Sequence, residues 1–134
     1  MENDGPRLFR ILFEVADLDA TSTFYATLLD VPARPVRGGR VYFDCGPVIL
    51  GIVDVSAGGR EPRPSSEYVY FAVTDLEAVH GRAVALGCLS KDDVHGASAA
   101  DIVVRPWGER SFYAADPFGN RLCFVDETTL FTGR

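Results

Sequence analysis

The chain has 134 residues, of which 47% are hydrophobic, with a formal net charge of −6 and a pI near 4.8. An acidic chain is a poor partner for nucleic acid, because neutralising phosphates needs a basic surface. There is no apolar run long enough to span a membrane and no signal-peptide pattern, so we expect a cytoplasmic protein with no membrane partner. The cysteines Cys45, Cys88 and Cys123 lack paired spacing and are expected as reduced thiols.

The first half of the chain predicts a strand, a helix and three short strands. Residues 8–14 alternate, which places Arg10, Leu12 and Glu14 on one face of the first strand. The helix begins near Asp17, whose carboxylate can cap free backbone N–H groups, and Pro32 stops it. Glycine turns then separate strands expected at residues 33–37, 40–44 and 48–54.

The second half repeats this pattern. FEVADLDA begins at Phe13 and FAVTDLEA begins at Phe71, an offset of 71 − 13 = 58 residues, and five of the eight positions are identical. A period of this length seen twice indicates a duplicated supersecondary unit. We expect a helix from Asp75 to Gly87, a weak strand near Cys88, a polar loop over 91–101, and strands at 111–116 and 121–125.

The two halves predict one α+β domain, residues 1–134, made of two βαβββ modules. The modules cover residues 7–55 and 66–127, and a linker rich in Gly, Pro and Ser, 56–65, joins them. If the sheets of the modules pair, they form a curved, cup-like mixed sheet with the helices outside. The concave face of such a sheet is the natural place for a ligand.

The chain resembles the vicinal oxygen chelate superfamily, which groups glyoxalases, extradiol dioxygenases, fosfomycin-resistance enzymes and bleomycin-resistance proteins. The segments that carry the resemblance are VADLDATSTFY at 15–25, VTDLEA at 73–78 and PWGERSFYAADPFGNRLCF at 106–124. The stretch from Pro106 to Asp126 is most similar to bleomycin-resistance proteins. The resemblance implies paired βαβββ modules and a homodimer.

Enzymes of this superfamily hold a divalent metal through His and Glu side chains. The motifs carry those positions to Arg10, Leu50, Tyr68 and Cys123. Arginine has no lone pair to give, leucine has no donor, and tyrosine and cysteine must ionise to bind a metal well. We therefore expect no metal and no other cofactor.

Cys123 poses a separate question, because it could be a metal ligand, a nucleophile or a wall residue. Arg10 could lower its pKa across the sheet, which a nucleophile would need. Neither His80 nor His95 is placed as an obvious general base. We therefore interpret Cys123 as a small apolar wall residue.

Polar and aromatic side chains on the predicted concave face define a candidate cleft. Arg10 and Glu14 could neutralise each other or pair with Arg121, or Arg10 could bind a ligand carboxylate or phosphate. The aromatic side chains could stack on a planar ligand, or they could fill the core or a dimer contact. The candidate ligand-binding residues are Arg10, Leu12, Glu14, Tyr68, Tyr70, Trp107, Tyr113 and Cys123.

The leading hypothesis is a metal-free protein that binds a small organic molecule, such as a drug or an antibiotic, and acts by sequestration. The alternative is a glyoxalase-like isomerase, lyase or dioxygenase with an altered metal site. Its replacement donors could only be Glu14, Asp44, His95 and Cys123. A third reading is an interaction module whose packed side chains fill the cup.

Overall fold

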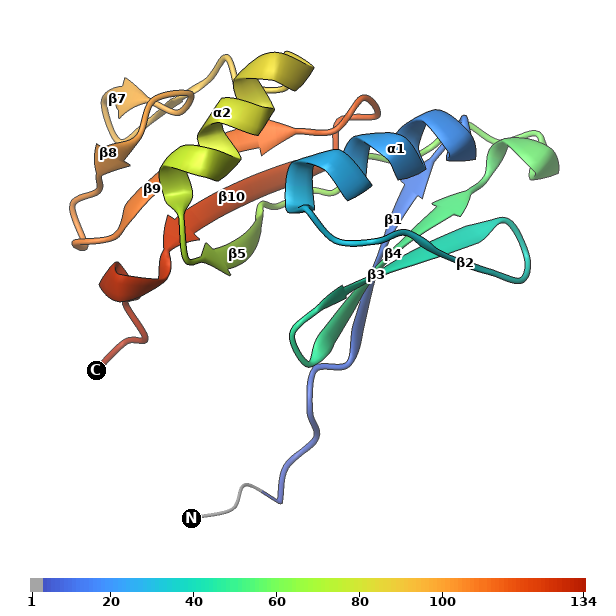
Figure 1. Cartoon of the computed structure of the whole chain (residues 1–134), viewed down its shortest axis with the longest axis horizontal. Coiled ribbons are helices and arrows are strands. Elements are labelled where there is room, and N and C mark those ends of the chain that lie inside the picture. Colours follow the sequence, from blue (N-terminus) through green and yellow to red (C-terminus); the bar gives the residue numbers. More distant parts are fainter. Residues whose placement is uncertain (1–3) are drawn as a thin grey trace.

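The computed structural model describes residues 4–134, which form two modules with one helix over a four-stranded sheet each (Figure 1). The first module contains β1 (Arg10–Val15), α1 (Leu18–Leu29), β2 (Arg34–Val36), β3 (Arg40–Cys45) and β4 (Val48–Asp54). The second contains β5 (Val69–Val73), α2 (Leu76–Leu86), β8 (Val103–Val104), β9 (Arg110–Ala115) and β10 (Arg121–Asp126). The predicted α+β class with two βαβββ modules is confirmed.

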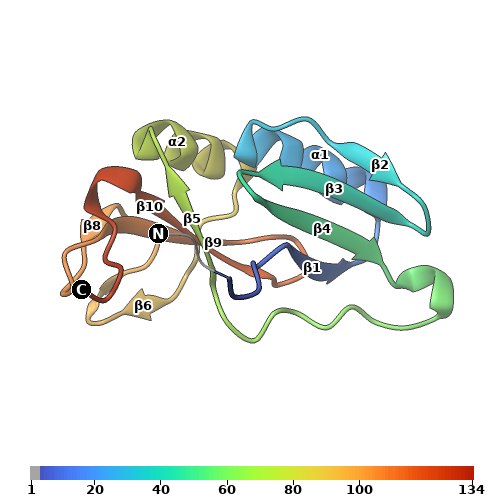
Figure 2. The same ribbon diagram turned by 90° about the horizontal axis from the view of Figure 1, so that it is seen from below.

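The two sheets have the same topology. Their strand orders are β1-β4-β3-β2 and β5-β10-β9-β8, and in each sheet the first pair is parallel and the others are antiparallel. No ladder joins the two sheets within residues 4–134. Instead, α1 and α2 contact each other, and Figure 2 shows the sheets side by side beneath them.

Period-two alternation decides which side chains enter the core. Phe13 is 3% exposed and Val15 is fully buried against the helix, whereas Leu12 on the opposite face is 44% exposed. Arg10, Leu12 and Glu14 therefore share one face of β1, as the sequence predicts. We call the face of each sheet that lies away from its helix the outer face.

Both helices begin at the aspartates that the sequence predicts. Asp17 accepts a hydrogen bond from Ala20 N at 3.2 Å, and Asp75 accepts one from Ala78 N at 3.1 Å. Each carboxylate satisfies a backbone donor that has no partner within its own helix. In the part of the chain that the structure describes, no helix is long and apolar enough to cross a membrane.

The region between α2 and β9 differs from the prediction. The expected polar loop over 91–101 contains a hairpin of β6 (Asp93–Val94) and β7 (Ala97–Ser98). Its turn residues His95 and Gly96 have φ values of 51° and 76°, the left-handed conformation of a two-residue hairpin turn. The weak strand expected near Cys88 is reduced to an isolated bridge between Leu89 and Ala114.

The turn between β9 and β10, Asp116–Asn120, fastens the second module to the first. Tyr25 of α1 donates its hydroxyl proton to Asp116 Oδ2 at 2.7 Å, and both residues are buried. Asn120 donates from Nδ2 to the same carboxylate oxygen at 2.7 Å and to the carbonyl oxygen of Glu14 in β1 at 3.0 Å. Its Oδ1 accepts from Ser65 N in the linker at 2.9 Å. The turn that closes the last hairpin is thus the main polar link between modules.

Candidate functional site

The eight predicted ligand-binding residues lie on two separate outer faces. Arg10, Leu12 and Glu14 belong to β1 of the first sheet. Tyr70, Tyr113 and Cys123 belong to β5, β9 and β10 of the second sheet. Tyr68 precedes β5, and Trp107 lies in the loop between β8 and β9. The structure therefore gathers five of the eight around the second sheet.

On the first outer face, the Tyr42 ring lies between two guanidinium groups and a glycine. The guanidinium carbon of Arg10 is 5.6 Å from the centre of the Tyr42 ring, and that of Arg34 is 5.8 Å from it. A Cβ atom at Gly51 would lie 2.5 Å from Leu12 Cδ2 and 3.0 Å from Tyr42 Cε1. Glycine is needed here because Leu12 and Tyr42 close over its backbone.

Glu14 pairs with the linker and not with Arg10 or Arg121. Its carboxylate accepts from Arg60 Nη1 at 2.6 Å, from Arg60 Nη2 at 2.8 Å and from Arg63 N at 2.8 Å. These bonds lower its pKa to about 2, with the Arg60 hydrogen bond as the largest cause. Arg10 makes no ion pair within residues 4–134, so its guanidinium rests on aromatic rings alone.

On the second outer face, the β6–β7 hairpin covers part of the predicted cleft. Tyr113 is 2% exposed and Cys123 is 1% exposed, and Val94 of the hairpin packs against their cluster. Tyr68 closes the same cluster, since its ring lies edge-on to Tyr113 at 4.7 Å between centres. Tyr113 and Cys123 therefore form an interior layer beneath the hairpin.

Cys123 is a buried thiol in the described fold. Burial raises the pKa of its thiol to about 12, although hydrogen bonding to Ser111 and Tyr113 acts in the opposite direction. A thiol with this pKa is protonated at neutral pH and is neither a good nucleophile nor a good metal ligand. Each histidine has another partner: the His95 ring lies against Trp107 at 5.0 Å, and His80 donates from Nε2 to Ala100 O at 2.9 Å.

Arg105 is a buried residue of this face that the sequence did not single out. It is 2% exposed, and its guanidinium donates to the Oγ and the carbonyl oxygen of Ser111, both at 3.0 Å, and to Ser98 O at 3.3 Å. Its charge also lies 5.0 Å from the centre of the Tyr113 ring. Arg105 thus fixes the loop before β9, and no local pattern distinguishes it from a solvated arginine.

A pocket of about 370 Å³ lies beside the middle of β5 and the last residues of β10, next to the second outer face. We call it the outer pocket. It contains two predicted residues, Tyr70 and Trp107, and six that the sequence analysis missed, among them Glu109, Leu130 and Phe131. Phe71, Ala72 and Val125 complete its walls. Of the missed residues, Glu109, Leu130 and Phe131 come from a turn and from the segment after β10, which carry no periodic signal.

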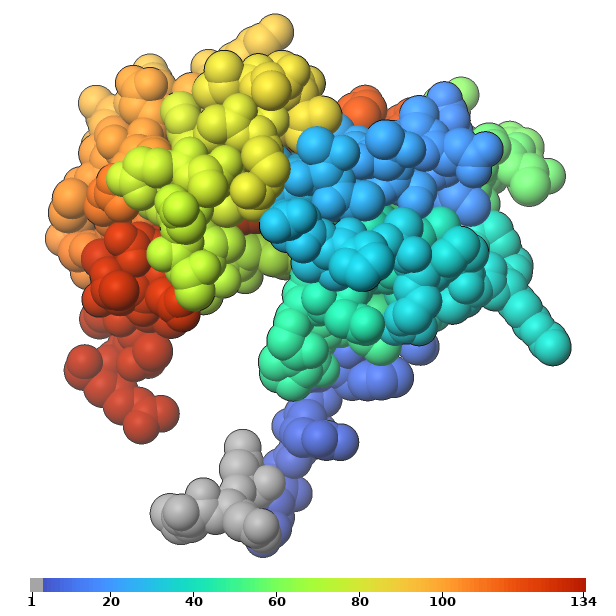
Figure 3. All heavy atoms as spheres, in the orientation of Figure 1, coloured from blue at the N-terminus to red at the C-terminus, as the bar shows by residue number. Residues whose placement is uncertain are grey.

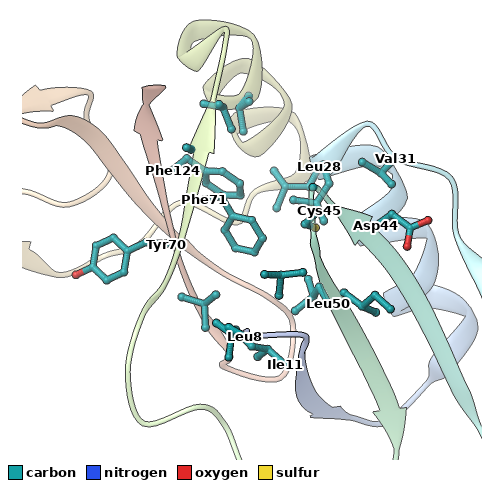
Figure 4. A pocket seen from close by; sticks show the side chains of 18 residues that line it. Leu8, Ile11, Leu28, Val31, Asp44, Cys45, Leu50, Tyr70, Phe71 and Phe124 are labelled. Carbon is teal, nitrogen blue, oxygen red and sulfur yellow. The ribbon is translucent and has the colours of Figure 1, made fainter. Parts of the chain in front are cut away.

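A larger cavity of about 470 Å³ lies between the modules, and we call it the inter-module groove. Its walls are mainly apolar and come from β1, β4, the end of α1 and β5. Figure 4 shows Phe71 pointing into this groove and the Tyr70 ring pointing away from it. Tyr70, Phe71 and Ala72 of β5 border both cavities, and the Tyr70 ring points to the side of the outer pocket.

The strand register corrects one of the four positions matched to the family metal site. Cys123 pairs with Tyr70 in the second sheet, and the repeat offset of 58 relates Tyr70 to Leu12, whose parallel partner is Gly51. Gly51, and not Leu50, therefore corresponds to Cys123. Leu50 is 2% exposed in the helix-side core.

The corrected set, Arg10, Gly51, Tyr68 and Cys123, does not fit a divalent metal. The glycine has no side-chain donor, the arginine is cationic, and the thiol is protonated. The replacement donors do not converge either, because Glu14 pairs with Arg60, Asp44 pairs with Arg34, and His95 lies against Trp107. Over residues 4–134 there is no group of three His, Cys, Asp or Glu side chains that could hold a metal ion.

Two βαβββ modules with one helix over each four-stranded sheet define a protein of the vicinal oxygen chelate superfamily. The chain belongs to the Glyoxalase-like domain family, whose profile matches residues 10–125. A comparison with curated proteins gave no match.

Several solved structures share this fold. One is named Oxidase ChaP-H2, with a TM-score of 0.72, 22% identity, and coverage of 90% of this chain and 93% of that chain. Another is a glyoxalase/bleomycin resistance protein from Albidiferax ferrireducens T118 (TM-score 0.71, 20% identity, coverage 87% and 95%). A third is a lactoylglutathione lyase from Agrobacterium tumefaciens (TM-score 0.62, 20% identity, coverage 92% and 96%). At these identities the likeness concerns the fold.

Proposed function

We propose that the protein is a metal-free small-molecule binding protein that sequesters an organic ligand, such as a drug or an antibiotic, in the cytoplasm. The observation that carries this proposal is the outer pocket, where Tyr70, Trp107 and Phe131 surround about 370 Å³ without a nucleophile or a metal donor set. Sequestration needs shape and stacking surfaces, which aromatic walls supply. The three free cysteines of the described chain support a reducing compartment.

The pocket has the properties that a planar ligand requires. The Tyr70 side chain is 58% exposed and Phe131 is 56% exposed, so their rings are accessible to a ligand. Trp107 is held by a hydrogen bond from its Nε1 to Glu109 Oε1 at 2.7 Å, so one wall is fixed before a ligand arrives. The remaining walls, including Ala72, Val125 and Leu130, are apolar.

Tryptophan fluorescence tests this proposal, because Trp107 is the single tryptophan of the chain. Planar aromatic compounds should quench it on binding and be recovered unchanged. Tyr70→Ala should weaken that binding by on the order of 1 kcal/mol, because a stacking partner is lost. The matched control Tyr42→Ala removes a ring from the other sheet and should leave the affinity unchanged, and Cys123→Ser should also leave it nearly unchanged.

Elemental analysis of tag-free protein tests the absence of a metal. About one equivalent of zinc, iron or manganese per chain, bound by side chains of the outer faces, would contradict the proposal. Catalytic conversion of a bound compound that disappears in Cys123→Ser, with binding retained, would favour an enzyme.

A further inference from the structure

Glu109 is the one acidic residue among those that line the outer pocket, and both of its carboxylate oxygens are held in place. Oε1 accepts from Trp107 Nε1 at 2.7 Å, and Oε2 accepts from the backbone N of Phe131 at 2.9 Å. A carboxylate can accept about four hydrogen bonds, so these two donors leave acceptor capacity on both oxygens. The group is therefore fixed in position but not saturated.

The charge of Glu109 is not balanced by a cation of the protein. Within residues 4–134 it forms no ion pair, and the basic side chains near it in sequence have other partners. Arg110 pairs with Glu77 and with Asp126, the latter at 3.3 Å. The guanidinium of Arg105 is buried against Ser111 and Ser98. A negative charge thus remains at the wall of an accessible pocket.

The other walls suit a cation as well. The rings of Tyr70, Trp107 and Phe131 reach the pocket from β5, from the β8–β9 loop and from the segment after β10. Aromatic faces are negative at their centres and attract organic cations. The field of Glu109 also reaches Tyr70, because partial burial raises the pKa of the Tyr70 hydroxyl and the Glu109 charge adds to this effect.

We propose that the outer pocket selects organic cations, and specifically planar nitrogen heterocycles with a positive charge, through the carboxylate of Glu109 and the three aromatic walls. This inference rests on the proposed function and adds the charge of the ligand to it. The wider surface has the matching sign, since residues 66–127 contain ten acidic and five basic side chains, a net −5 of the −6 of the whole chain. Such a field raises the rate at which cations reach the pocket.

Isothermal titration calorimetry with three ligands of similar shape tests the selectivity. The probes are 1-methylquinolinium, 4-methylquinoline and quinoline-4-carboxylate at pH 8, which are cationic, neutral and anionic. The cation should bind about tenfold more tightly than the neutral compound at low salt, and the anion should bind most weakly. In Glu109→Gln the advantage of the cation over the neutral compound should disappear, because the amide keeps an acceptor for Trp107 but carries no charge.

Glu127→Gln is the matched control, because it removes the same charge from an exposed residue that does not line the pocket. It should keep the preference for the cation. Equal affinities of the wild-type protein for the cation and the neutral compound would overturn the inference while leaving the proposed function intact. An equal loss for both ligands in Glu109→Gln would assign Glu109 a purely structural role and would also overturn it. Binding of none of the three would overturn the proposed function itself.

Discussion

Neighbouring side chains have different roles in this protein. Tyr68, which precedes β5, and Tyr70 of β5 are two positions apart, yet Tyr68 packs on Tyr113 beneath the β6–β7 hairpin while Tyr70 is 58% exposed at the outer pocket. Alternation along the strand predicts the side, because successive Cβ atoms point to opposite faces. How exposed each side chain is depends on the segment that covers it. Tyr68 and Cys123 are covered by the β6–β7 hairpin, where the sequence predicted a loop.

The Glu14–Arg60 pair predicts a loss of stability in acid. The folded-state pKa of Glu14 is lowered from 4.5 to about 2, so its contribution is complete above pH 4.5 and is lost as pH falls from 4.5 towards 2. Glu14→Gln should lower the thermal midpoint at pH 7, and the difference from wild type should vanish near pH 2. Thermal unfolding followed by circular dichroism between pH 2 and pH 7 measures both. Arg60→Gln should show the same convergence, and a difference that persists at pH 2 would contradict the pair.

At the scale of elements, the segments between strands and helices hold the modules together. The Asp116–Asn120 turn bonds to α1, to β1 and to the linker. The linker runs from η1 (Ser56–Gly58) past β1 to β5, as Figure 2 shows, and Arg60 fixes it to Glu14. The sequence predicts the turn at Asp116–Asn120 from its Asp, Pro, Gly and Asn residues. It could not predict the partners, because Tyr25 and Asp116 are 91 residues apart.

Tyr25→Phe tests the link between the modules. The hydroxyl of Tyr25 donates to Asp116 in a buried site, so its removal leaves a carboxylate one donor short and should cost about 2 kcal/mol of unfolding free energy. Urea denaturation monitored by circular dichroism provides the measurement. Tyr68→Phe is the control, because its hydroxyl has an exposed contact with Asp92 at 3.5 Å. Similar losses of unfolding free energy in the two variants would show that the Tyr25–Asp116 hydrogen bond does not stabilise the protein more than an exposed contact does.

At the scale of the whole molecule, the two modules leave a hollow between them. Figure 3 shows it between the β3–β4 turn and the C-terminal segment. The edge strand β5, with the uncharged sequence VYFAV, borders it, and Leu8, which is 67% exposed, lies beside it. An uncharged edge strand beside exposed apolar side chains is a surface that a partner chain commonly covers. We therefore propose that a second copy of the chain covers it.

A homodimer is thus the expected state in solution. Light scattering at micromolar concentration should give twice the chain mass of 14.6 kDa. Leu8→Asp places a charge beside the hollow and should shift the equilibrium towards monomer. Val84→Asp, on an exposed face of α2 where the side chain is 54% exposed, is the matched control and should leave the dimer intact. A wild-type monomer across the whole dilution series would contradict this expectation.

Local patterns in the sequence were sufficient for the repeat, for the helix starts at Asp17 and Asp75, and for the face of β1 that carries Arg10, Leu12 and Glu14. The helix starts and the strand face depend on residues a few positions apart, whose spacing follows from backbone geometry, and the repeat is visible by direct comparison of two segments. The tertiary structure decided which predicted residues are covered, that Glu14 pairs with Arg60, and that Tyr70, Trp107 and Phe131 meet in one pocket. Those outcomes require segments dozens of residues apart to pack together, and burial and ion pairing are properties of that packing.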